Sequence, residues 1–192
     1  MKTISMIAIA FMLTGCAAWN SVTGNAYAPK TAEFVISNAK DTPDIFNKNS
    51  KVTFPTYNLR HFTNYKEVTG MSMWSAPDTQ ILPYAAYTEK SCNAYISMSI
   101  NRSEWAFYDS AKDDEGNTLT FISDDQRIDT NKNKLIVEDF RVKLPSGFLT
   151  KNKGRNPQIK IFGKRDNFVI FLPDYYIDGM LQYFADNNIN CK

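Results

Sequence analysis

Alternating apolar and polar residues narrow the fold of this chain more than any other feature. Between Asn93 and Ile100 every second side chain is apolar, and the same period of two recurs over residues 135–144. Successive side chains of a β-strand point to opposite faces, so both runs predict strands with one buried face. The residues predicted inward are Ala94, Ile96, Met98, Ile100, Ile136, Phe140, Val142 and Leu144. One buried and one solvated face is typical of an antiparallel sheet.

Polar turns separate three of the predicted strands. Asn101–Ser103 and Asp113–Asn117 have turn composition. Short turns join antiparallel neighbours, so residues 93–100, 104–111 and 118–123 predict a three-stranded meander.

The C-terminal part predicts a hairpin followed by a helix. Residues 158–163 and 167–172 flank a polar turn, and 168–172 is apolar on both faces, so we expect a central, covered strand there. Asp174 is the predicted N-cap of a helix covering this strand, because Ile177, Met180, Leu181 and Phe184 follow at helical spacing. Gly179 lowers helix propensity by up to about 1 kcal/mol, so packing must stabilise the helix.

The region between residues 34 and 92 has a weaker pattern. Prolines interrupt its short apolar pieces, so we expect no long helix and only short strands at 51–54, 57–62 and 79–87. The predicted fold class is α+β: a mostly antiparallel sheet, built as a meander plus a hairpin, with a C-terminal amphipathic helix on one face.

Composition favours one globular domain. Of the 192 residues, 43% are hydrophobic, which is enough to build one hydrophobic core, and the chain is too short for two domains. The formal net charge is only +2, whereas nucleic-acid binding needs a strong basic excess. We expect a single globular domain over 34–192 and no nucleic-acid partner.

The N-terminus has the layout of a secretory signal. Lys2 precedes the apolar run 4–13, which is well short of the roughly 20 residues of a membrane-spanning helix. The run ends in Leu13-Thr14-Gly15-Cys16, which resembles the lipobox of bacterial lipoproteins. The resemblance implies cleavage before Cys16, a diacylglyceryl thioether on its sulfur and acylation of the new amino group. The alternative is an ordinary signal peptide with a chance cysteine.

The same resemblance implies a subcellular localisation. Ala17 stands where an aspartate would retain an enterobacterial-type lipoprotein at the inner membrane, so the resemblance implies the outer membrane of a Gram-negative bacterium. Residues 1–15 would be the signal peptide. The small and polar residues 16–33 are expected to be a lipidated tether.

Two cysteines remain for the domain. Cys92 and Cys191 make an even pair in an oxidising compartment, which predicts a disulfide closing a loop of about 100 residues. The alternative is a redox pair or a metal site, but the sequence contains no CxxC motif that would support it.

Candidate catalytic residues form no recognisable motif. His61 is the only histidine, and Gly-x-Ser-x-Gly is absent from the sequence. Asp129–Asn133 resembles the start of a calcium loop, but Lys134 and Phe140 stand where that loop needs Gly and a bidentate Glu. We therefore expect no metal and no cofactor. Acidic residues that would serve as a glycosidase pair cluster at Glu104, Asp109, Asp113, Asp114, Glu115, Asp124, Asp125 and Asp129.

A basic stretch follows this acidic one. From Arg141 to Arg165 the sequence has eight basic residues and no acidic residue. If the strands there are neighbours, one surface carries Arg141, Lys143, Lys160, Lys164 and Arg165, and it would face anionic headgroups, lipopolysaccharide phosphates or an acidic partner. The alternative is that these cations are solvated or attracted to neighbouring acidic strands.

Five aromatic residues lie among Ser, Thr and Pro: Tyr57, Tyr65, Trp74, Tyr84 and Tyr87. They would either recognise a protein or glycan partner or cover the hydrophobic core. Two functions remain open. The first is a non-enzymatic, outer-membrane-anchored lipoprotein that binds an envelope protein, glycan or lipopolysaccharide, or maintains the envelope. The second is an envelope hydrolase of glycan or peptide with carboxylates in 104–129, about 5 to 10 Å apart in a cleft.

Overall fold

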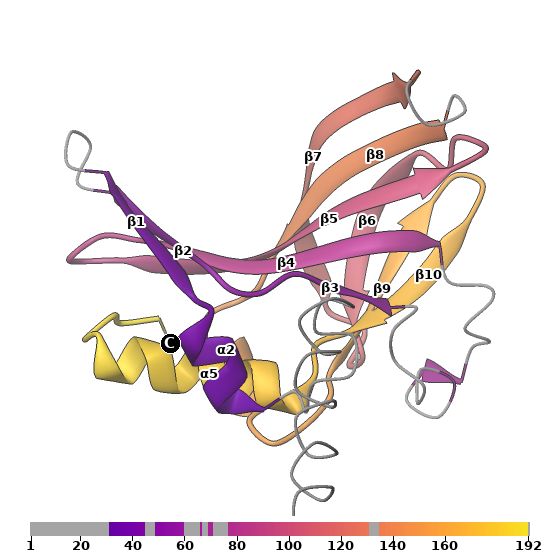
Figure 1. Cartoon of the computed structure of the whole chain (residues 1–192). Coiled ribbons are helices and arrows are strands. Elements are labelled where there is room, and N and C mark those ends of the chain that lie inside the picture. The colour runs from indigo at the N-terminus through magenta and orange to yellow at the C-terminus, as the bar shows by residue number, and fades with distance from the viewer. Residues whose placement is uncertain are drawn as a thin grey trace, which may run out of the picture. The chain divides into compact units, whose positions relative to one another are not determined.

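The computed structural model describes residues 31–44, 49–59, 66, 69–70, 77–130 and 135–191. In these ranges the chain forms one curled antiparallel sheet in the order β1-β2-β4-β5-β8-β7-β6-β9-β10, with β3 paired to β4 (Figure 1). The strands are β1 (Lys40–Asp44), β2 (Asn49–Thr53), β3 (Tyr57–Asn58), β4 (Asp78–Tyr87), β5 (Cys92–Arg102), β6 (Tyr108–Asp113), β7 (Thr118–Asp129), β8 (Leu135–Lys143), β9 (Gln158–Gly163) and β10 (Asn167–Phe171). The helices whose bounds lie within the described residues are α2 (Ala32–Ser37), α4 (Phe148–Lys151) and α5 (Asp174–Asp186).

The α+β class, with a mostly antiparallel sheet and a C-terminal helix, is confirmed. The alternation of apolar and polar residues predicted the buried faces of β5 and β8 correctly. Their register sets Ile96 opposite Val142 and Met98 opposite Phe140, and all four side chains are buried. One continuous core follows from this pairing.

The predicted meander is wrong. β5 pairs with β4 and β8, and β6 pairs with β7 and β9, so β5 and β6 are not neighbours. Residues 103–107 form no strand, because Phe107 takes a left-handed conformation with φ 57° that breaks the extended backbone. The turn at 113–117 is confirmed: Asp113 Oδ1 accepts hydrogen bonds from the amides of Glu115 and Asn117.

The β9–β10 hairpin is confirmed, but the central position predicted for β10 is wrong. β10 lies at an end of the strand order. It is nevertheless buried, because the curl of the sheet brings distant rings onto it. The Tyr108 and Phe168 rings pack edge to face at 5.3 Å, and the Tyr57 hydroxyl donates to the Phe171 carbonyl at 2.9 Å.

Helix α5 packs on the part of the sheet near β2 and β3, where Phe54 contacts Phe184 and Tyr57 contacts Tyr176. Its N-cap is Pro173, one residue before the predicted Asp174. Gly179 has a packing role. A Cβ there would lie 2.7 Å from Val35 Cβ, so only glycine lets α2 approach this closely.

Helix α2 was not predicted, and it corrects the expected tether. Thr31 is its N-cap and its side chain accepts from the Phe34 amide, so residues 31–33 belong to the folded unit that begins at Thr31. With six residues, α2 is too short to show a helical period.

The predicted disulfide is confirmed. Cys92, the first residue of β5, is bonded to Cys191 beyond α5, with a Cα–Cα distance of 4.8 Å. The bond ties the C-terminus of the described chain to the sheet.

Candidate functional site

The connection between β5 and β6 builds the most unusual local structure in the described chain. It turns back through Ala106 and Phe107, and a positive φ is unfavourable for a residue as bulky as Phe107. Such strain persists only where the surroundings hold it in place. Here a buried carboxylate on β8 holds it.

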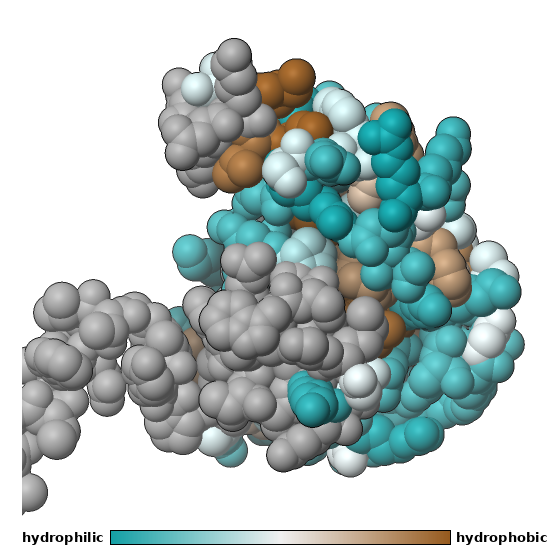
Figure 2. Space-filling view, turned by 90° about the vertical axis from the view of Figure 1, so that its right-hand side faces the viewer, coloured by the Kyte–Doolittle hydropathy of each residue, from teal (hydrophilic) through white to brown (hydrophobic). Residues whose placement is uncertain are grey.

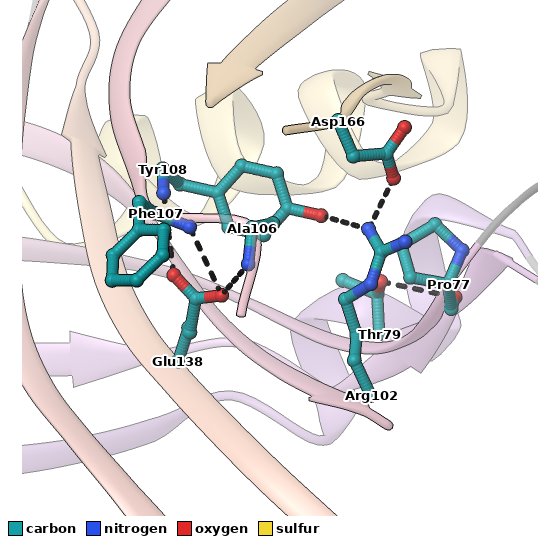
Figure 3. Close-up of polar contacts among 8 residues, drawn as sticks. All are labelled: Pro77, Thr79, Arg102, Ala106, Phe107, Tyr108, Glu138 and Asp166. Atoms are coloured by element: carbon teal, nitrogen blue, oxygen red, sulfur yellow. Dashed lines mark hydrogen bonds and ion pairs between the residues drawn. The ribbon is translucent and has the colours of Figure 1, made fainter. Parts of the chain in front are cut away.

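Glu138 projects from β8 into the interior and is only 2% exposed. Its Oε1 accepts from the amides of Ala106 at 2.7 Å and Phe107 at 3.3 Å, and its Oε2 accepts from the Tyr108 amide at 3.2 Å (Figure 3). Three donors offset the large desolvation penalty of a buried carboxylate. Both oxygens are occupied by backbone amides, so the arrangement fits a structural role better than general acid–base chemistry.

A second polar cluster fixes the other side of the connection. Arg102, near the end of β5, donates from Nη1 to the Tyr108 hydroxyl at 2.5 Å and to the Asp166 carboxylate (Figure 3). Burial raises the pKa of Tyr108 to about 12, so its phenol is neutral at physiological pH. The cluster links β5, β6 and the turn between β9 and β10.

Rings and cations gather on the outer side of this connection. We call this set the basic aromatic surface: Trp105, Phe107, Lys160, Phe162, Lys164 and Arg165. The Trp105 and Phe107 rings stack with centroids 5.9 Å apart. Lys164 Nζ lies 6.0 Å and Arg165 Cζ 5.5 Å from the Phe107 centroid. On β9, Lys160 Nζ lies 5.1 Å from the Phe162 centroid, within the range of a cation–π contact.

The single basic surface predicted from the sequence is divided in two. β7 and β6 lie between β8 and β9, so Arg141 and Lys143 are not neighbours of the β9–β10 cations. Arg141 Nη2 lies 2.7 Å from Asp124 Oδ1, and its Nη1 donates to the Tyr84 hydroxyl. The alternative, attraction between neighbouring strands of opposite sign, therefore describes Arg141 better.

The acidic residues of 104–129 are spread over separate elements. Asp124 pairs with Arg141 and Asp125 pairs with Arg127, both on the β7–β8 side of the sheet. Glu115, in the β6–β7 turn, pairs with Lys151. These contacts engage each of the three carboxylates with a cation.

Two hollows are lined by residues of the disulfide or by residues close to it in sequence. The larger, of about 460 Å³, lies between β1, β2, the end of β4 and residues 187–189. The smaller, of about 120 Å³, lies beside Cys92, Lys143 and Phe148. Neither is lined by an acidic residue from 104–129, so neither provides the cleft that a hydrolase built on those acids needs.

The predicted loop aromatics have mixed outcomes. Tyr57, Tyr84 and Tyr87 lie on strands. Tyr57 and Tyr84 are buried, which fits the core alternative, and Tyr87 donates to Asp41. His61, Tyr65 and Trp74 lie outside the described residues, as do positions 131–134 of the calcium-like segment.

No family model, curated protein or solved structure matches this chain. Among the described residues, no group of three His, Cys, Asp or Glu side chains is placed to hold a metal ion. Within the same ranges, no helix is long and apolar enough to cross a membrane. Function must therefore be argued from the chain's own residues.

Sequence reasoning missed Glu138, although a signal was present. The alternation over 135–144 places position 138 on the inward face with Ile136 and Phe140. A carboxylate at an inward position needs several hydrogen-bond donors, and a strand partner cannot supply them all. The pattern thus indicated that an irregular segment with free amides would meet this strand.

We expect Glu138→Gln to lower the free energy of unfolding by about 1–3 kcal/mol, because the new amide group must face at least one backbone N–H and leaves that donor without an acceptor. Urea unfolding measures the loss, and faster chymotrypsin cleavage after Trp105 or Phe107 reports release of the connection. Glu104→Gln, at an exposed position of the same connection, is the matched control. Equal stability and cleavage in the two variants would contradict the role of Glu138.

Proposed function

We propose that this chain is a lipoprotein anchored to the outer membrane of a Gram-negative bacterium through lipid on Cys16. The observation that carries the proposal is the segment Leu13-Thr14-Gly15-Cys16 directly after a short apolar run. The disulfide between Cys92 and Cys191 supports it, because such bonds persist in oxidising compartments outside the cytoplasm.

The anchored domain acts as a non-enzymatic binding or envelope-maintenance module. The carboxylate of Glu138, which is the most deeply buried one in the described ranges, is fully engaged by backbone amides, and the exposed acids Asp125 and Glu115 are paired with cations. Carboxylates held in this way are typical of a rigid scaffold that presents a surface to a binding partner. None of these three carboxylates lines either of the two hollows described above.

Mass spectrometry of the mature protein tests the proposal. The N-terminal peptide should begin at Cys16 and carry a diacylglyceryl group on sulfur and an acyl group on nitrogen. On a density gradient the protein should migrate with outer-membrane markers. A free Cys16 thiol, cleavage at another bond, or migration with inner-membrane markers would each overturn the corresponding part of the proposal.

A further inference from the structure

Two lysines face each other directly across neighbouring strands. The register of β6 and β9 sets Lys112 opposite Lys160, and both side chains are exposed. Like charges in directly opposite positions destabilise a sheet. Neither lysine makes an ion pair with an acid in the described ranges, so the repulsion between them is not offset within this part of the chain.

The positive charge continues into the β9–β10 turn. Lys164 and Arg165 are exposed and lie beside the Phe107 ring, without an ion pair to a described acid. Asp166, the one acid of this turn, is engaged by Arg102. The exposed acids nearby in sequence are Glu104, Asp109, Asp114 and Glu115. Glu115 is paired with Lys151, and among the described residues the other three form no ion pair with the four cations. Figure 2 views the molecule from the right-hand side of Figure 1, and the coloured atoms of that face are mostly hydrophilic.

Backbone contacts, rather than attraction between side chains, hold these groups together. The amides of Lys164 and Arg165 donate to the carbonyls of Phe107 at 3.3 Å and Ala106 at 3.2 Å. A Cβ at Gly163 would lie 2.7 Å from the Ala106 carbonyl oxygen, so the turn and the connection are as close as glycine allows. With Glu138 holding the strained Phe107, the backbone from which the rings of the connection and the cations of the turn project is fixed before any ligand arrives.

The chemistry of this surface selects its ligand. Lysine and arginine side chains that have no ion-pair partner among the described residues favour an anionic ligand, and several over one face favour an extended one. Trp and other amphipathic aromatics beside them are typical of residues at the level of lipid headgroups. We propose that the basic aromatic surface, extended by Lys112, docks the domain onto an anionic phospholipid surface. The choice of a membrane over other extended anions rests on the proposed lipid anchor, which would hold the domain next to headgroups.

The apolar end of the β7–β8 hairpin is a separate feature. Ile128 is 54% exposed, and Figure 2 shows apolar side chains at the upper end of the molecule, where β7 and β8 end. Nothing in the structure shows what covers this end, so it is not part of the proposed contact.

Vesicle co-sedimentation tests the contact without the lipid anchor. The protein is the chain from residue 16 with Cys16→Ser, exported behind a conventional signal peptide so that the disulfide forms. At low ionic strength it should bind equimolar phosphatidylcholine–phosphatidylglycerol vesicles and not phosphatidylcholine vesicles. Binding should disappear at about 1 M salt, where the Debye length is about 3 Å. No binding at low salt, or binding that salt does not weaken, overturns the proposal and leaves the mass-spectrometric test of lipidation unaffected.

Charge reversal tests whether the basic aromatic surface is the part of the domain that contacts the membrane. Near an anionic membrane each cation strengthens binding about fivefold at low ionic strength, so Lys160→Glu/Lys164→Glu/Arg165→Glu should weaken it at least tenfold. The matched control, Lys143→Glu/Lys153→Glu/Arg155→Glu, changes the net charge equally at exposed or half-buried positions on other elements, and it should stay within about threefold of the parent. An equal loss in both variants would mean that overall charge drives binding, which overturns the proposal. A single cooperative unfolding transition confirms that each variant is folded.

Tryptophan fluorescence locates the contact independently. Trp19→Phe/Trp74→Phe leaves Trp105 as the sole tryptophan of the chain. Its emission should shift to shorter wavelength when anionic vesicles are added at low salt, and the shift should be absent in the Lys160, Lys164 and Arg165 reversal. Vesicle binding with no change in Trp105 emission would place the contact elsewhere and overturn the proposal.

Discussion

Replacing Cys16 by serine should release the protein from the membrane fraction. Serine lacks the thiol that takes the diacylglyceryl group, and each buried CH₂ of an acyl chain contributes about 0.8 kcal/mol to membrane binding. Removing two or more chains therefore removes the main attachment that we propose. Acyl labelling should be lost together with membrane fractionation.

Carbonate washing makes this result specific. Alkaline carbonate strips proteins that are held at a membrane by charge, so it removes any contribution from the basic aromatic surface. Ala18→Ser is the matched control, since it introduces a serine two residues away and keeps the Cys16 thiol, so labelling and fractionation should stay intact. If the Cys16→Ser protein still fractionates with the outer membrane after the wash, the anchor assignment is wrong.

Local periodicity predicted those parts of the fold that depend on local contacts. β5, β8, the β9–β10 hairpin and the buried stripe of α5 all follow from residues within one or two turns or strand lengths of each other. Strand order does not follow from such patterns. β5 pairs with β8, about forty residues away in sequence, and residues 103–107 form no strand beside β5, since Phe107 is left-handed and its amide donates to Glu138.

The same limit explains the outcome at the candidate site. The sequence identified all the cations of the basic stretch, but their adjacency depends on the strand order, which separates Lys143 from Lys160. The lysine opposite Lys160 was overlooked because Lys112 lies outside the basic stretch, in the acidic segment. Trp105 and Phe107 were predicted on a regular strand, and it is the irregular backbone that sets them beside Lys164 and Arg165.

Removing the disulfide is expected to cause the largest loss of stability. Cys92 and Cys191 are 99 residues apart in sequence, and closing a loop of this size removes chain entropy from the unfolded state worth up to about 4.7 kcal/mol. The bond also holds residues 187–191, whose amides hydrogen-bond only to the end of α5 or within the segment itself; the Ile189 amide, for example, donates to the Phe184 carbonyl at 2.8 Å. We therefore expect Cys92→Ser/Cys191→Ser to lower the free energy of unfolding by several kcal/mol and to release this segment.

Urea unfolding in the unlipidated Cys16→Ser background measures the loss, because lipid does not interfere there. The double variant and the chemically reduced parent should give the same unfolding curve, since both lack only the crosslink. Hydrogen exchange at the Ile189 amide provides a local readout, and it should accelerate before the core amides of β5 and β8 do, because the C-terminus opens without global unfolding once the bond is absent. A double variant within about 1 kcal/mol of the oxidised parent would show that the crosslink does not limit the unfolded chain. Unchanged protection at Ile189 would show that packing of α5 alone orders the C-terminus.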